Sequence, residues 1–480
     1  MTTRPRTPTG ISAADPGPRP GRLMLPVLLS AWFLAQFDFF VVNVAAPSIR
    51  HDLRTGPAAL EMAVGGYAFA YAAGMITGGR LGDRFGYRRT FTGGVLAFTL
   101  ASLLCGAATG PVTLTCARLL QGLAGAVMVP QVLALITAAY PPATRPRALG
   151  WYGAAGGLGS IAGQVLGGLL LQADVLGLGW RVIFLVNVPI GLLAAWLAVR
   201  ALPPLGAGRP PGQDPLGALG LAATLALVLV PLTLGRGQGW PAWAWAGLLG
   251  SVPLAVLVGW WQRHLSARGG SPVLETALFR SRSYVAGIVA VTAFMAYFAS
   301  FMFTLALLLQ DGLGMGALRA GTVFAPMGVS FSATALLGPR LIARYGPRTT
   351  VFGGATTGLG LALLALCLHA AGPRTGPAWI VLALTLVGLG NGLVLPRLLG
   401  ISLVDVRPDQ AGIGGAVLTT AQQFAGAAGV AVLGTVFFAL AGPSADLPGA
   451  MATTTLIDLL LITAVTLMLL PLTRPTRPRS

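Results

Sequence analysis

Fourteen apolar runs, each about 20 residues long, follow one another along this chain. A helix of about 20 apolar residues crosses the ~30 Å hydrocarbon core of a bilayer. With 55% hydrophobic and 9% charged residues in 480, the chain has too few charges to cover a soluble protein of this size. We therefore expect an all-α polytopic membrane protein, surrounded by the lipid bilayer, with spans at residues 23–46, 57–79, 89–109, 112–138, 147–171, 181–201, 215–235, 242–262, 283–309, 317–342, 349–370, 377–400, 411–441 and 452–471.

The basic residues, all of them arginine, indicate how these spans are oriented. If both termini lie on one side, 24 of the 31 arginines lie on that side, six lie on the other, and Arg118 lies within a span. Basic loops stay in the cytoplasm, so we expect a multi-pass plasma-membrane protein with both termini cytoplasmic. The net charge of +18 then reflects topology. A nucleic-acid partner is not expected, because binding would need basic residues gathered on one soluble face.

A charged turn occurs twice in the chain. Residues 78–89 read GGRLGDRFGYRR, and residues 338–348 read GPRLIARYGPR, 260 positions later (338 − 78). The copies follow the second and the tenth span, so they are eight spans apart. Two six-helix halves alone would place them six spans apart. We therefore expect two pseudo-symmetric six-helix bundles plus two inserted helices. The expected units are a disordered cytoplasmic tail (1–22), an N-terminal bundle (23–202), a linker with the inserted pair (203–281), a C-terminal bundle (282–472) and a cytoplasmic tail (473–480).

Further motifs accompany the first turn. Residues 38–47 read DFFVVNVAAP, residues 118–122 read RLLQG, residues 180–191 carry Trp-Arg-x-x-Phe-x-x-Asn-x-Pro-x-Gly, and residues 422–430 read QQFAGAAGV. With the turn at 79–89, these motifs resemble those of the major facilitator superfamily and, within it, the fourteen-helix drug:proton antiporters. The resemblance covers residues 23–472. It implies export of amphipathic drugs or antibiotics in exchange for protons, by alternating access.

The resemblance also implies that the first charged turn is a cytoplasmic gate, which latches that side closed. Its glycines permit tight turns and close helix approach, and Asp83 can form ion pairs with the neighbouring arginines or cap a helix end. In the second copy Ile342 and Ala343 replace Gly82 and Asp83. The expected gate residues are Gly79, Arg80, Gly82, Asp83, Arg84, Gly86, Arg88 and Arg89.

The fifth span departs from the antiporter pattern. Antiporters of this type have Gly-Pro-x-x-Gly-Gly there, and this chain has Gln164 in place of the proline. The glycines still allow close helix packing, but the bend that proline would cause is lost, which leaves symport or facilitated movement open. The expected packing motif comprises Gly159, Gly163, Gln164, Gly167 and Gly168.

Few charged residues lie within spans, where each is costly, and the clearest are Asp38, Arg118 and Asp458. Asp38 and Arg118 come out at similar membrane depth, so we expect them to be neighbours that face a central water-filled cavity and couple transport to protons. A carboxyl group there would hold either a proton or a cationic substrate, and each would bias the protein toward one conformation. The alternative is a buried ion pair that only fixes helix packing. Asp458 has a weaker claim, because the last helix is expected to be peripheral.

The substrate is the least determined feature. The family plan would line the cavity with Gln36, Phe37, Asn43, Gln121, Phe294, Tyr297, Phe298 and Asn391. A largely apolar and aromatic pocket with one acid suits a small, amphipathic and often cationic compound. A proton-coupled transporter of a specific metabolite, lipid or siderophore is the alternative within this class.

Other classes of protein fit less well. An enzyme would need a polar catalytic cluster, but His51, His264 and His369 are scattered near helix ends, and the three cysteines lack metal-ligand spacing. A channel or a non-transporting membrane sensor fits the hydropathy but does not explain the repeat. No Gly-x-x-x-x-Gly-Lys loop occurs, so ATP drive is not supported. We expect no metal, no cofactor and a functional monomer.

Overall fold

The structure is a computed structural model that describes residues 21–55, 57–141, 144–205, 214–235, 238–274, 276–346, 348–404, 406, 411–442 and 446–472. Within these ranges the chain is helical and contains no strand. The first half consists of α1 (Met24–Asp52), α2 (Pro57–Phe85), α3 (Tyr87–Gly106), α4 (Pro111–Ala139), α5 (Arg145–Ala173), α6 (Val182–Leu185) and α7 (Asn187–Ala201). The inserted pair is α8 (Pro215–Leu234) and α9 (Ala242–Ala267). The second half consists of α10 (Arg282–Leu307) with the π-helical turn η5 (Leu308–Gly312), α11 (Ala317–Tyr345), α12 (Arg348–Ala371), α13 (Pro377–Ser402), α14 (Ala411–Ala441) and α15 (Leu447–Leu472).

A helix occupies each of the fourteen expected spans, and thirteen are long and apolar enough to cross a membrane over their described residues. The exception is α2, which is 29 residues long but rich in glycine and alanine. It packs against α4, α8 and α14, so fewer of its side chains have to meet lipid. The sixth span is interrupted at Val186, between α6 and α7. Pro189 explains the interruption, because it cannot donate a hydrogen bond to the carbonyl four residues earlier.

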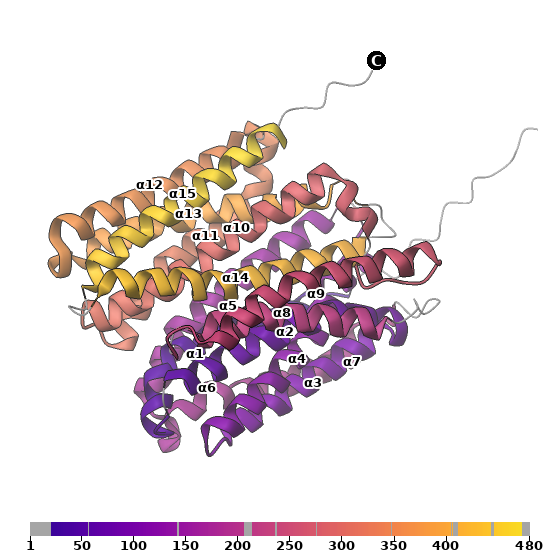
Figure 1. Ribbon diagram of the computed structural model, residues 1–480, viewed down its shortest axis with the longest axis horizontal. Coiled ribbons are helices and arrows are strands. Elements are labelled where there is room, and N and C mark those ends of the chain that lie inside the picture. Colours follow the sequence, from indigo (N-terminus) through magenta and orange to yellow (C-terminus); the bar gives the residue numbers. More distant parts are fainter. Residues whose placement is uncertain are drawn as a thin grey trace, which may run out of the picture.

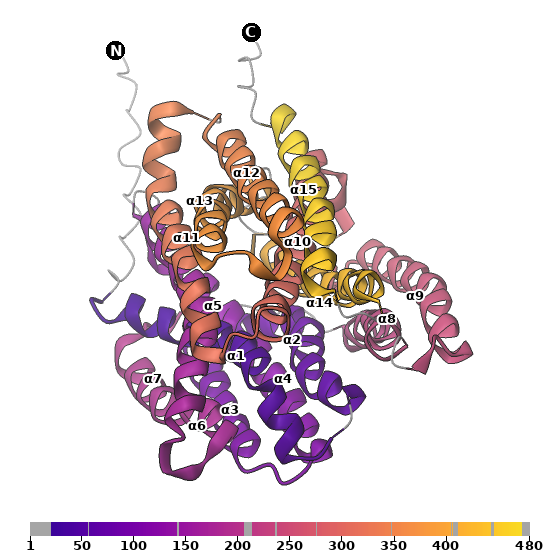
Figure 2. The ribbon, with the colours of Figure 1, turned by 90° about the vertical axis from the view of Figure 1, so that its left-hand side faces the viewer.

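The two halves repeat the same helix packing. In the first half α1 packs on α5, α2 and α3 on α4, and α3 on α7; in the second, α10 packs on α14, α11 and α12 on α13, and α12 on α15. The helices of the first half therefore correspond in order to those of the second, from α1 and α10 to α7 and α15. Figures 1 and 2 show the two groups as separate indigo-to-magenta and orange-to-yellow bundles. The fold prediction of two pseudo-symmetric six-helix bundles is confirmed.

The inserted pair lies beside the seam between the halves. Helix α8 contacts both α2 and α14, and α9 packs mainly on α8 (Figure 2). The carboxylate of Asp214, at the start of α8, accepts hydrogen bonds from Trp261 Nε1 (2.9 Å) and Gln262 Nε2 (2.6 Å) of α9, and from the backbone N–H groups of Gly217 (2.8 Å) and Val273 (3.4 Å). One buried acid therefore holds together both inserted helices and the segment that follows them.

The halves meet where α5 packs on α11 and α2 on α14. We call the end of the molecule that carries residues 78–89 the loop face, and the other end the opposite face. Toward the opposite face α5 and α11 are in close contact: a Cβ added to Gly321 would lie 2.9 Å from Val165 Cα. Near the middle of the helices, a Cβ on Gly157 would lie 2.6 Å from the ring of Phe331.

Toward the loop face the same two helices separate. Gly153 lies one turn before Gly157 on the same side of α5, and Gly338 lies two turns beyond Phe331 on α11. A Cβ added at Gly153 or at Gly338 would meet nothing within 4 Å. Helices α5 and α11 are thus packed together from the opposite face to the middle of the molecule and diverge near the loop face.

Candidate functional site

Asp38 lies deep within the first half. It is 14 residues past the start of α1 (38 − 24), about 21 Å along the helix axis, and its side chain is 0% exposed. Its carboxylate forms an ion pair with Arg118 of α4. Its Oδ1 atom also accepts hydrogen bonds from Gln121 Nε2 (2.8 Å) and Asn187 Nδ2 (3.0 Å). Three donors from α4 and α7 thus satisfy an acid on α1.

Arg118 is equally enclosed, with 1% of its side chain exposed. Its guanidinium donates to Gln121 Oε1 (2.7 Å) and to the backbone oxygen of Ala63 (3.4 Å), and it lies 4.3 Å from the ring centroid of Tyr67. A buried charge is tolerated only when it is paired and hydrogen-bonded, and cation–π contact adds to its stabilisation. The side chain is therefore held in one position by α1, α2 and α4.

Ser102 of α3 completes this group, which we call the Asp38 cluster: Asp38, Ser102, Arg118, Gln121 and Asn187. The hydroxyl oxygen of Ser102 accepts from Gln121 Nε2 (2.7 Å) and Asn187 Nδ2 (3.4 Å). Ser102 was not among the expected site residues, and Asn187 was expected only as part of a motif. Both residues could have been found in the sequence as polar side chains inside apolar spans, because a polar side chain in a span is expected to have a hydrogen-bond partner there.

The expected pairing of Asp38 with Arg118 is present, but the cluster does not face a water-filled cavity between the halves. Both side chains point into the interior of the first half, where α1, α2, α3, α4 and α7 surround them. The reason is energetic: these helices supply the polar partners that water would otherwise provide. In this conformation the pair is sealed from solvent.

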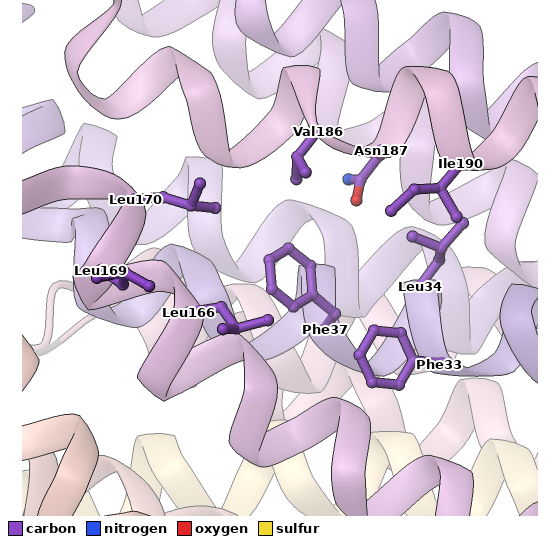
Figure 3. Close-up of a pocket in the computed structure, with 9 residues that line it drawn as sticks. All are labelled: Phe33, Leu34, Phe37, Leu166, Leu169, Leu170, Val186, Asn187 and Ile190. Atoms are coloured by element: carbon purple, nitrogen blue, oxygen red, sulfur yellow. The ribbon is translucent and has the colours of Figure 1, made fainter. Parts of the chain in front are cut away.

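The cavity residues expected in the first half lie in different places. Gln121 belongs to the Asp38 cluster, Phe37 is 4% exposed, and Gln36 is half-buried where α1 meets α5. The side chain of Asn43 lies outside the described part of the structure. Phe37 helps to line a small cavity of about 160 Å³ between α1, α5 and the sixth span, where Figure 3 shows it between the α5 leucines and Val186. This cavity is apolar except for Asn187.

The cavity residues expected in the second half form another group. Phe294, Tyr297 and Asn391 are each 0% exposed and lie in the core of that half. Asn391 Nδ2 donates to Tyr297 Oη (3.0 Å), and Phe298 is partly buried and stacks on Phe294 with 6.1 Å between ring centroids. The structure thus divides the seven expected residues whose side chains it describes between the two halves, and it does not gather them around one cavity.

Asp83 of the charged turn was expected to form ion pairs with the neighbouring arginines or to cap a helix end. Its Oδ1 atom accepts a hydrogen bond from Tyr87 Oη (2.8 Å). Partial burial raises the pKa of Asp83, against the opposing effects of the Tyr87 hydrogen bond and of Arg80. Gly86 links α2 to α3 with φ at 87°, a conformation that favours glycine.

The arginines of the turn have separate contacts. Arg80 donates to the backbone oxygens of Ser271 (3.0 Å) and Pro272, and Arg88 to that of Leu202 (3.5 Å). Arg84 lies over the ring of Phe85, and Arg89 is exposed. Gly82 is closely packed, because a Cβ there would lie 1.9 Å from Gln131 Oε1, whereas Gly79 is half-buried. Arg80 therefore joins the turn to the segment after α9, which Asp214 also binds.

The glycines of the packing motif form a stripe on α5 that faces α1. A Cβ would lie 2.8 Å from the backbone oxygen of Phe33 at Gly159, 2.7 Å from that of Phe37 at Gly163, and 2.7 Å from Val41 Cγ2 at Gly167. Gly168 and Gln164 are buried as well, and α5 runs through Gln164 without interruption. The stripe lets α1 approach closely at the residues that flank Asp38.

Comparison with known proteins agrees with this architecture. The sequence profile described as Major Facilitator Superfamily matches residues 28–430. The chain is 39% identical over 441 residues to a probable actinorhodin transporter of Streptomyces coelicolor, covering 90% of this chain and 75% of that protein. It is 35% identical over 432 residues to a puromycin resistance protein of Streptomyces alboniger, covering 88% and 84%.

Among solved structures, a crystal structure of the peptide transporter POT, as an E310Q mutant in complex with sulfate, has a similar fold. The TM-score is 0.64 at 19% identity, and the match covers 95% of this chain and 98% of that chain. The Streptomyces coelicolor relative and the solved structure are named as transporters. With its many apolar helices, this chain is a multi-pass membrane protein.

Proposed function

This chain belongs to the Major Facilitator Superfamily, and we propose that it exports small amphipathic compounds, antibiotics among them, in exchange for protons. The Asp38 cluster carries the proposal. An ionised acid at the centre of a membrane protein is costly and commonly marks an ion or proton pathway. The relatives include an actinorhodin transporter and a puromycin resistance protein, both named for antibiotics.

The coupling works through the partners of Asp38. Protonation of the carboxylate removes the negative charge that balances Arg118, and the other donors of the cluster then lose a charged acceptor. The cluster joins α1 to α3, α4 and α7, so a change in its charge alters the packing of four helices. Because Asp38 is sealed here, proton exchange requires a second conformation in which α1 and α4 open to water.

The separation of α5 and α11 supports alternating access. These helices are packed toward the opposite face and diverge toward the loop face. With the loop face in the cytoplasm of a plasma membrane, as the arginine distribution favours, this arrangement corresponds to an inward-facing state.

The proposal is tested by transport in inverted membrane vesicles. Ethidium serves as the cationic probe, and a proton gradient that is acid inside drives its uptake. We expect the wild-type protein to accumulate ethidium, and actinorhodin or puromycin to compete. Asp38→Asn should abolish gradient-driven accumulation while the protein stays in the membrane, whereas Asp174→Asn, at an exposed acid that follows α5, should keep it. Full accumulation by Asp38→Asn would refute the role of Asp38.

A further inference from the structure

The second half contains a polar group in the position that the Asp38 cluster occupies in the first. Tyr297 of α10 hydrogen-bonds Asn391 of α13, and Thr357 Oγ1 of α12 donates to Asn391 Oδ1 (3.1 Å). Asp458 of α15 lies beside them, with Ser300 and Tyr297 of α10 facing its carboxyl group. The four helices α10, α12, α13 and α15 correspond to α1, α3, α4 and α7, which carry the Asp38 cluster.

Backbone packing establishes the equivalence residue by residue. A Cβ added to Gly122 would lie 2.3 Å from the backbone oxygen of Tyr67 on α2, and one added to Gly388 would lie 2.0 Å from that of Met327 on α11. Tyr67 and Met327 are 260 positions apart, as are the two copies of the charged turn, so the two glycines make the same contact in the two halves. Gly122 and Gly388 are therefore counterparts.

The same register shows what the second half lacks. Arg118 lies four residues before Gly122, and Leu384 lies four residues before Gly388. Leu384 is an uncharged side chain that is 0% exposed, in the core of the second half. No cation occupies the position that corresponds to Arg118, so the acid of the second half has no partner of opposite charge there.

Asp458 is nevertheless fully enclosed. It is 2% exposed, and its Oδ1 atom has no hydrogen-bond partner among the described residues. Of the titratable side chains on the elements packed around it, Tyr297 of α10 faces it. Arg282 and Tyr284 lie at the start of α10, and Arg374 lies in η6 (Gly372–Arg374), beyond the end of α12. Helix α14 carries no titratable side chain, and Asp311 of η5 is exposed. The titratable side chains of α12 lie toward the ends of that helix: Arg348, Cys367 and His369. An ionised carboxylate that is buried without a cation is far more costly than a protonated one.

We propose that Asp458 is a second proton-binding carboxyl group, which is protonated in the conformation described here and releases its proton to water when the second half rearranges. The inference rests on the proposed function, since it adds a proton site to the same exchange. Asp38 and Asp458 would then differ in one respect. The first is balanced by a fixed arginine, and the second is balanced only by the proton it binds.

Infrared spectroscopy of the full-length protein in lipid vesicles tests the inference without substrate. A protonated carboxyl group and a carboxylate have separate carbonyl bands, and the band lost in Asp458→Asn belongs to Asp458. Thr455→Val is the matched control, because Thr455 is a buried side chain on α15 that also lacks a partner but does not titrate. Should Asp458→Asn fail to purify as one species, Asp458→Glu assigns the band by its shift.

The conformational step is tested by a cross-link that holds α5 to α11, between Gly157→Cys and Ser332→Cys. We expect the protonated band at neutral pH, and we expect it to survive to higher pH in the cross-linked protein than in the free protein. Absence of the band at every pH, or a band with the same pH dependence in both, would overturn the proposal. Neither result depends on Asp38, so loss of the proposed transport activity would be seen separately, in the ethidium assay.

Discussion

Arg118 and Asp38 form an ion pair between α4 and α1, across 80 positions of sequence, with no more than 1% of either side chain exposed. Removing one member leaves the other charge buried without a partner, which costs about 3–5 kcal/mol. Removing both charges leaves a neutral cluster. A change at this pair is therefore expected to affect both the stability of the protein and its proposed proton coupling.

We expect Arg118→Gln and Asp38→Asn each to lower the melting temperature of the purified protein, and the double variant to melt above the Arg118→Gln protein. The reason is that Asn in place of Asp removes the unbalanced carboxylate. Thermal unfolding followed by fluorescence in detergent measures the effect. Additive losses in the double variant would show that the two charges do not depend on each other.

The glycine stripe of α5 gives a steric prediction. Gly163→Ala places a methyl group 2.7 Å from the backbone oxygen of Phe37, which cannot move without shifting α1. We expect a lower melting temperature and impaired transport. Gly153→Ala is the matched control on the same helix, where the methyl group meets nothing within 4 Å. It should be neutral or stabilise by about 0.5–1 kcal/mol, because alanine favours the helix. Equal effects at the two positions would contradict the assigned packing of α5 on α1.

Asp214 gives a pH dependence of stability. Partial burial acts to raise its pKa, but hydrogen bonds from Trp261, the Gly217 amide, Gln262 and the Val273 amide outweigh it and lower the pKa below 3.8. A lowered pKa in the folded protein contributes stability above the unfolded value, and this contribution is lost as the pH falls through the folded value. The melting temperature should therefore fall below about pH 4, and it should fall less steeply in Asp214→Asn. Parallel curves for the two proteins would show that the acid does not hold the inserted helices.

The contact between α5 and α11 gives a conformational prediction. A Cβ at Gly157 lies 3.4 Å from Ser332 Oγ, so cysteines at these two positions come within disulfide range. In a background without Cys105, Cys116 and Cys367, we expect the cross-link to form and to stop ethidium transport until it is reduced. Cysteines at Gly153 and Gly338, where the same helices diverge, should not cross-link in this conformation. A cross-linked protein that still transports would exclude rocking of the halves at this contact.

Much of the fold was predictable from the sequence. The apolar runs are long enough to cross a bilayer, and length and hydropathy alone identify such helices, with boundaries within a few residues. The repeated turn at 78–89 and 338–348 also gave the pseudo-symmetry and the inserted pair. The sequence also predicted that Asp38 and Arg118 lie at a similar depth in the membrane, because the rise per residue fixes how far along its helix each side chain lies.

Rotation about the helix axis was not predictable, and it decides the site. A span such as α1 is apolar on nearly every side, so its sequence pattern does not say which side meets lipid, the other half or its own bundle. For that reason the sequence analysis placed Asp38 beside a cavity, whereas the folded chain turns it toward Ser102 and Asn187. The position of Asp458 beside Tyr297 could not be predicted either, because it also depends on the rotation of each helix about its axis. The sequence by itself determined where the fourteen helices lie along the chain and how far along its helix each charge lies. Only tertiary packing, by fixing the rotation of each helix, decided which side chains those charges meet.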